Sequence, residues 1–182
     1  MKKLILFSTV LCLTIMLQAQ TNKTNPIDEM FNKYSEKEGF TVVTISGKMF
    51  SMLANLDSEN NDPDNVISRL KSIRVLSVED SLLNKNINFY TELGKKLAFS
   101  EYEELMVVKE GPDITKFLIK QNGEKISELL VIKGGPGGNS LISIRGDLNL
   151  KNISDLSKST GIEELKSLDK IEDKSQKPVK KE

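Results

Sequence analysis

The stretch "ITKFLIKQNGEKISELLVIKGGPGGNSLISIRGDL", residues 114–148, decides the fold. Polar and apolar side chains alternate along 114–120, where Lys116 and Lys120 fall on the same side of the chain. A period of two predicts a β-strand that has one face in water and the other on an apolar core.

Hairpin turns join this strand to its neighbours. The pair Asn122 and Gly123 is the strongest hairpin signal of the chain, because a two-residue turn favours residues that accept a positive φ. Gly111 and Pro112 form a second turn signal. Together these signals predict four strands in a meander, at 104–110, 114–120, 126–133 and 140–146.

The first half of the chain adds two strands and several helices. Segments 40–46 and 73–78 are apolar on both faces, so we expect them in the centre of the sheet. Helical spacing predicts helices at 25–39, 48–56, 81–98 and 148–161, and a short helix that begins at residue 63. The order predicts an α+β domain: a single mostly antiparallel sheet of about six strands with helices packed on one face.

The N-terminus has the layout of a secretory signal peptide. Two lysines, an unbroken apolar run and the small-residue step before Gln20 predict a signal peptide at residues 1–20, with cleavage near Ala19 or Gln20. An uncleaved anchor is the alternative. Because Leu11 precedes Cys12, where a lipoprotein needs a small residue, lipid anchoring through Cys12 is not expected.

The remaining chain divides into a domain at 25–162 and a charged tail at 163–182, which we expect to be disordered or helical with frayed ends. After cleavage no membrane span is expected, and the location would be periplasmic or secreted. The balance of 26 basic and 26 acidic residues argues against nucleic-acid binding.

Catalytic residue types are few. The chain has no histidine, and its one cysteine lies in the predicted signal peptide. This composition argues against a conventional catalytic triad, a thiol nucleophile or a usual zinc site. We therefore expect no enzyme, no cofactor and no resident metal, and a hydrolase is the alternative.

Three features of the sequence are candidate ligand sites. The glycine loop, residues 134–138, precedes a strand and not a helix, so it is interpreted as a hairpin loop and not as a phosphate cradle. Lys48 and Arg145, each beside a glycine at a strand end, would form a small anion site if their strands were neighbours. A weak calcium loop is the third feature, at Asp57, Glu59 and Asn61.

The segment "NPIDEMFNKYSEKEGFTVVTISGKMFSML" and the closing "SLISIRGDLNLKNISDL" carry a family resemblance over about residues 25 to 162. They resemble the start and end of an uncharacterised exported family of Bacteroidetes, domain of unknown function 4252. The resemblance implies a family and no activity. Many of its members resemble lipoproteins, a pattern from which this chain departs at Cys12.

Two main hypotheses of function follow, beside a third, a calcium-responsive domain at the loop that contains Asp57. The first is an exported, non-enzymatic envelope protein that contacts an unknown envelope protein through a sheet face or a loop edge. The alternative is a small-molecule or anion-binding module built around Lys48, Arg145 and the glycine loop. Such a module could also have weak hydrolase activity. The oligomeric state is left open by both.

Overall fold

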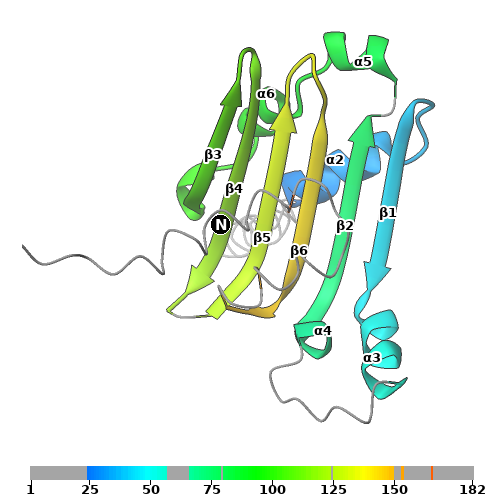
Figure 1. The fold of residues 1–182 in the computed structure, drawn as a ribbon, viewed down its shortest axis with the longest axis vertical. Coiled ribbons are helices and arrows are strands. Elements are labelled where there is room, and N and C mark those ends of the chain that lie inside the picture. Colours follow the sequence, from blue (N-terminus) through cyan, green and yellow to red (C-terminus); the bar gives the residue numbers. More distant parts are fainter. Residues whose placement is uncertain are drawn as a thin grey trace, which may run out of the picture.

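A computed structural model describes residues 24–56, 66–78, 80–123, 125–149, 153 and 165. Its centre is one open six-stranded antiparallel sheet in the order β1-β2-β6-β5-β4-β3 (Figure 1). The strands are β1 (Phe40–Ser46), β2 (Leu70–Val78), β3 (Glu103–Glu110), β4 (Asp113–Asn122), β5 (Lys125–Gly134) and β6 (Ser140–Leu148). The predicted α+β class with a single antiparallel sheet of six strands is confirmed.

The meander forms at the turns that the sequence predicts. β3 and β4 are joined at Gly111, and β4 and β5 at Gly123. Both glycines have a positive φ, of 61° and 62°, which side chains with a Cβ rarely adopt. The register then runs without interruption from Ile114, opposite Gly134, to Lys120 before a bulge shifts it.

The helices are short and lie around the sheet. They are α2 (Pro26–Tyr34), α3 (Gly47–Leu56), α4 (Val66–Arg69), α5 (Ser81–Asn86), α6 (Phe89–Gly94) and the 3-10 turn η2 (Phe99–Glu101). Helix α2 begins as its sequence predicts: the Asn25 side chain accepts a hydrogen bond from the Ile27 amide at 2.9 Å, and Pro26 occupies the first turn.

Both faces of the sheet bear apolar side chains. On the face behind the sheet in Figure 1, α2 and α6 pack on β2, β4, β5 and β6, with Phe31 and Phe89 fully buried. The opposite face has a second cluster, to which Phe50 of α3, Ile153 and Leu165 contribute. Burial on both faces explains why β5 and β6 read as nearly continuous apolar runs.

The prediction that β1 lies in the centre of the sheet is wrong, whereas β2 is an inner strand as expected. β1 is an edge strand that pairs with β2 alone, and Val43 in its middle is 43% exposed. Apolar residues on both faces of a segment do not report whether a strand lies on each side of it. Segment 40–46 has apolar residues on both faces and yet forms an edge strand of the sheet.

Two expected helices differ from the structure. The stretch 81–98 forms α5 and α6 with a break at Ile87 and Asn88, where the Asn88 side chain caps α6. Of the expected helix at 148–161, the part from 150 onward lies outside the described residues except for Ile153. The predicted signal peptide, Cys12 and the tail beyond Leu165 also lie outside the described residues. Among the described helices, none has the length and apolar character to cross a membrane.

Candidate functional site

A buried carboxylate lies on the face of the sheet that α2 covers. Glu128 of β5 is 5% exposed and accepts three hydrogen bonds. Its Oε1 accepts from the Ser143 hydroxyl at 2.6 Å and from Arg145 Nε at 3.0 Å, and its Oε2 accepts from the Tyr102 hydroxyl at 2.9 Å. A buried charge is stable only with such partners, so Glu128 organises a polar cluster within the apolar sheet.

Arginine side chains continue this cluster to α2. Asp28, in the first turn of α2, accepts from Arg74 Nη1 at 2.6 Å and lies 3.4 Å from Arg145 Nη1. The Arg74 guanidinium also lies over the Phe31 ring, 3.9 Å from its centroid. The two arginines therefore join α2 to β2 and β6, and the carboxylates on both sides neutralise them.

The protonation states follow from these contacts. Burial and the neighbouring Glu128 charge raise the pKa of the Tyr102 hydroxyl far above its usual value, so Tyr102 stays a neutral donor. Burial disfavours the charged form of Arg145, but Glu128 and Asp28 outweigh burial and raise its pKa. Chemically, the cluster is a set of fixed donors around the buried Glu128 carboxylate.

One donor of the cluster has no partner among the described residues: Arg145 Nη2 is buried and makes no hydrogen bond there. Lys48, the other residue of the predicted anion site, is exposed at the start of α3. Because β2 lies between β1 and β6, the strand that precedes Lys48 and the strand that contains Arg145 are not neighbours. The structure thus places Arg145 beside Asp28 and Glu128, and within the described residues no hydrogen bond or ion pair joins it to Lys48.

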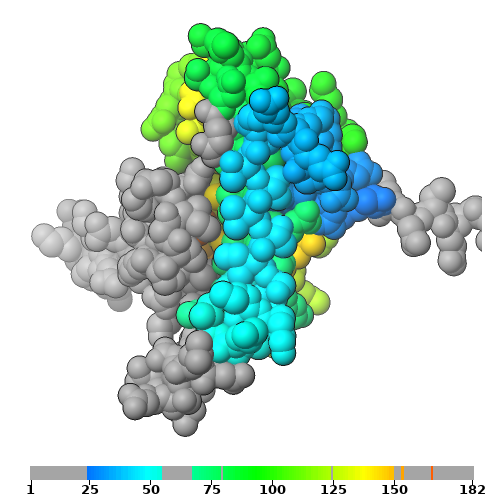
Figure 2. Space-filling view, turned by 90° about the vertical axis from the view of Figure 1, so that its right-hand side faces the viewer, coloured from blue at the N-terminus to red at the C-terminus, as the bar shows by residue number. Residues whose placement is uncertain are grey.

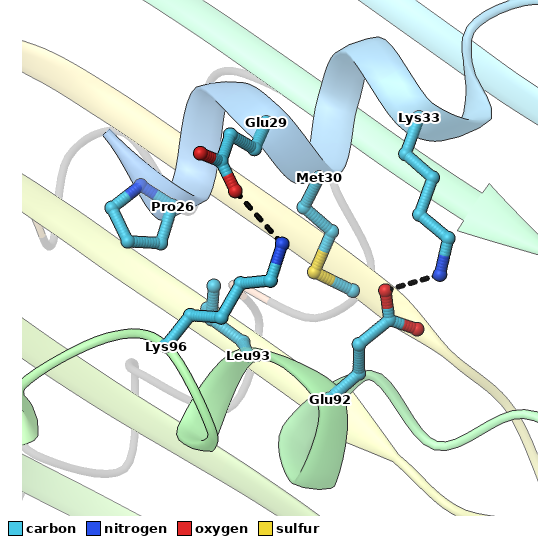
Figure 3. A pocket seen from close by; sticks show the side chains of 7 residues that line it. All are labelled: Pro26, Glu29, Met30, Lys33, Glu92, Leu93 and Lys96. Atoms are coloured by element: carbon cyan, nitrogen blue, oxygen red, sulfur yellow. Dashed lines mark hydrogen bonds and ion pairs between the residues drawn. The ribbon is translucent and has the colours of Figure 1, made fainter. Parts of the chain in front are cut away.

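A small cleft separates α2 from α6 (Figure 3). Its volume is about 200 Å³, below the 300 to 1,000 Å³ that is usual for small-molecule pockets. Two ion pairs cross it, Lys33 with Glu92 at 2.5 Å and Lys96 with Glu29 at 2.8 Å, as the dashed lines in Figure 3 mark. The lining charges therefore join α2 to α6 and to the segment directly after α6.

The glycine loop is a hairpin loop between β5 and β6, as interpreted from the sequence. The Asp113 carboxylate lies against it and accepts a 2.9 Å hydrogen bond from the Gly137 amide. A Cβ on Gly135 or Gly137 would overlap that carboxylate. The buried Asn139 side chain fixes the loop from inside by donating to the Gly135 carbonyl at 3.0 Å. The space that a phosphate would need beside these glycines thus contains Asp113.

Exposed apolar residues gather at one edge of the molecule. Val43 of β1 and three residues of α3 form what we call the β1–α3 surface: Val43 is 43% exposed, Met49 48%, Met52 55% and Leu53 39%. In Figure 2 this edge faces the viewer, and β1 and α3, in cyan, form a continuous column with no described segment drawn over it. Large exposed apolar side chains in such a group are typical of interaction surfaces.

The two edge strands of the sheet differ in chemistry. Four of the eight residues of β3 are charged, and a bulge interrupts its pairing with β4 between Glu104 and Met106. The seven residues of β1 include no charge and no proline, and they pair with β2 without a shift of register. Charges and bulges protect an edge from pairing with another strand, so β3 is protected and β1 is not.

The predicted calcium residues Asp57, Glu59 and Asn61 lie outside the described residues. Within the described segments, no group of three or more carboxylate or thiol residues is placed to hold a metal ion. Sequence reasoning missed the cluster around Glu128. The available signal was a glutamate on the same side of β5 as Leu130 and Ile132, an apolar face where an ionised residue needs partners.

Comparison with protein families gives a match over most of the chain. The model of a family described as "Domain of unknown function (DUF4252)" matches residues 34–156, which include all six strands of the sheet. Comparisons with curated proteins and with solved structures gave no match.

Proposed function

The chain belongs to the family described as Domain of unknown function (DUF4252), and we propose that it is an exported, non-enzymatic envelope protein that binds a protein partner through its β1–α3 surface. The observation that carries the proposal is that an unprotected edge strand, β1, is followed directly by a helix with exposed Met49, Met52 and Leu53. An extended segment can add to such an edge through backbone hydrogen bonds while apolar side chains contribute affinity.

The polar residues support a non-catalytic role. Glu128, the most buried carboxylate of the described residues, is occupied by three donors from its own chain. Its neighbour Tyr102 has a raised pKa, which opposes its use as a base near neutral pH. Both residues join elements of the fold, and we assign them to stability.

Export is supported by the residues before the domain, where two lysines precede an apolar run and a small-residue step at Ala19. Cell fractionation is expected to recover the protein outside the cytoplasm. Mass spectrometry of the recovered chain is expected to give an N-terminus near Gln20 without lipid. Recovery in the cytoplasm with Met1 retained would contradict the export part of the proposal.

Photo-crosslinking tests the binding surface. A photoreactive amino acid is placed at Val43 or at Met52, and at Lys109 on the opposite edge strand as the matched control. On irradiation of intact cells, we expect crosslinked protein adducts from the first two positions and none from Lys109. Adducts of equal yield at all three positions, or at none, would contradict a specific surface.

A second candidate is anion binding at Arg145, which the unpartnered Nη2 favours. Inorganic phosphate would then raise the melting temperature of the wild type and of Lys48→Ala, and it would not raise that of Arg145→Lys. An equal response of Arg145→Lys and the wild type would eliminate this candidate.

A further inference from the structure

We propose that the occupant of the β1–α3 surface is a second copy of this chain, bound with β1 antiparallel to β1, so that the two sheets continue as one. This inference rests on the proposed function, because it names the partner of the same surface. It starts from the edge itself: the outer backbone N–H and C=O groups of β1 need hydrogen-bond partners, and another strand can supply them in a row.

The sequence of β1 suits pairing with itself. With a twofold axis at Val43, that residue lies opposite Val43 of the second copy, and Thr41 lies opposite Ile45. Residues 42 and 44, and 40 and 46, form the remaining pairs. Odd residues meet odd ones and even residues meet even ones, so each face of one sheet continues into the same face of the other. Pairs of β-branched residues across strands are favourable.

The charges that flank β1 select the antiparallel direction. Glu36 and Glu38 precede the strand and are exposed, and Lys48 follows it and is exposed. Lys37 is directed away, since its ammonium lies 5.0 Å from the Tyr34 ring centroid. Antiparallel pairing places Lys48 of each copy near the acidic flank of the other, whereas parallel pairing would place like charges together.

Helix α3 enlarges the contact. A seven-residue strand is only about 23 Å long, and a stable interface needs about 800 Å² from each partner. Met49, Met52 and Leu53 continue the apolar surface past the end of β1, toward the segment before β1 of the second copy. Apolar residues at this place therefore contribute the area that the strand lacks.

Sedimentation velocity of the purified protein tests the inference. We expect a dimer for the wild type, and monomers for Val43→Lys and for Val43→Glu alone, because like charges would meet on the twofold axis. An equimolar mixture of the two variants is expected to regain the dimer, since opposite charges then meet. Leu82→Lys, at a 66% exposed apolar residue of α5, is the matched control and should remain a dimer. Circular dichroism establishes that each variant is folded.

Thr41→Lys, at an exposed position of the same strand, replaces the Val43 variants if they do not fold, and it is expected to be a monomer. A monomeric wild type, a dimeric Val43→Lys protein, or folded Val43 variants that stay monomeric when mixed would overturn the second copy as the occupant. The crosslinked adduct at Val43 separates the two proposals. An adduct with twice the mass of the chain supports both proposals. An adduct that contains a different protein overturns this inference alone, and the absence of any adduct at Val43 overturns both.

Discussion

The Tyr102 hydroxyl donates a 2.9 Å hydrogen bond to Glu128 Oε2, and it thereby joins the segment before edge strand β3 to β5, two strands away. Glu128 also accepts from Ser143 and Arg145 of β6. One buried carboxylate thus connects three parts of the chain on the face that α2 covers. Its loss should affect stability more than any exposed ion pair would.

Replacement of Glu128 tests this directly. Glu128→Ala leaves Arg145, Ser143 and Tyr102 without their acceptor, and we expect the free energy of unfolding to fall by about 3 kcal/mol. The control is Glu104→Ala, which removes a half-exposed carboxylate paired with Lys116 at 2.7 Å and should cost no more than about 1 kcal/mol. Urea unfolding measures both, and equal losses would contradict a central role for Glu128.

Tyr102 determines part of the stability at alkaline pH. Its pKa is raised in the folded state, so its contribution is fully present below the usual tyrosine pKa of 10.0 and is lost as the pH rises above it. We expect the wild type to lose stability above that pH more steeply than Tyr102→Phe. Urea unfolding at about pH 8 and about pH 10.5 gives the two slopes. Parallel slopes would show that Tyr102 ionises as freely in the folded chain as in the unfolded one.

Glu92 contributes to the stability of the protein at acidic pH. Burial alone would raise its pKa, but hydrogen bonds from Lys33 and Tyr34 lower it below 4.5. A lowered pKa contributes stability above the unfolded value, and that stability is lost as the pH falls through the folded value. The wild type should therefore lose more stability than Glu92→Gln between neutral pH and about pH 3. Thermal melting across this range measures the difference, and identical acid profiles would argue against it.

Asn139 fixes the glycine loop and the start of α6 together. Its side chain is 3% exposed, accepts from the Phe89 amide at 2.8 Å and donates to the Ile87 carbonyl at 3.1 Å. Asn139→Ala should lower the free energy of unfolding by about 2 kcal/mol, because buried backbone groups lose their partner. Asn86→Ala, whose amide makes one exposed bond to the Leu82 carbonyl, is the control and should change it little. Similar effects of the two substitutions in urea unfolding would contradict this role.

The sequence predicted the part of the fold that local signals control. Strands β3 to β6 alternate or run apolar between glycine turns, and adjacent strands in the chain are adjacent in the sheet. The break between α5 and α6 was missed because it depends on a residue far along the chain. Apolar residues keep their helical spacing through Ile87, which predicts one continuous helix. In the structure, the Asn139 side chain binds the backbone on both sides of Asn88 and the helix is interrupted there.

The site was harder to predict for the same reason. The sequence suggested Arg145 as a cation that would bind an anion together with Lys48, whereas in the structure it contacts Asp28, which is 117 residues away in the chain. No local pattern connects the two. The exposure of β1 depends on the order of strands in the sheet, which its own seven residues do not encode.

Amide hydrogen exchange of β1 is the measurement that tests the central claim most directly, because pairing at its edge would protect backbone amides of Phe40–Ser46. We predict that exchange in this strand slows as the protein concentration rises, while exchange in the protected edge strand Glu103–Glu110 does not change. Exchange in β1 that is fast and independent of concentration would contradict the account.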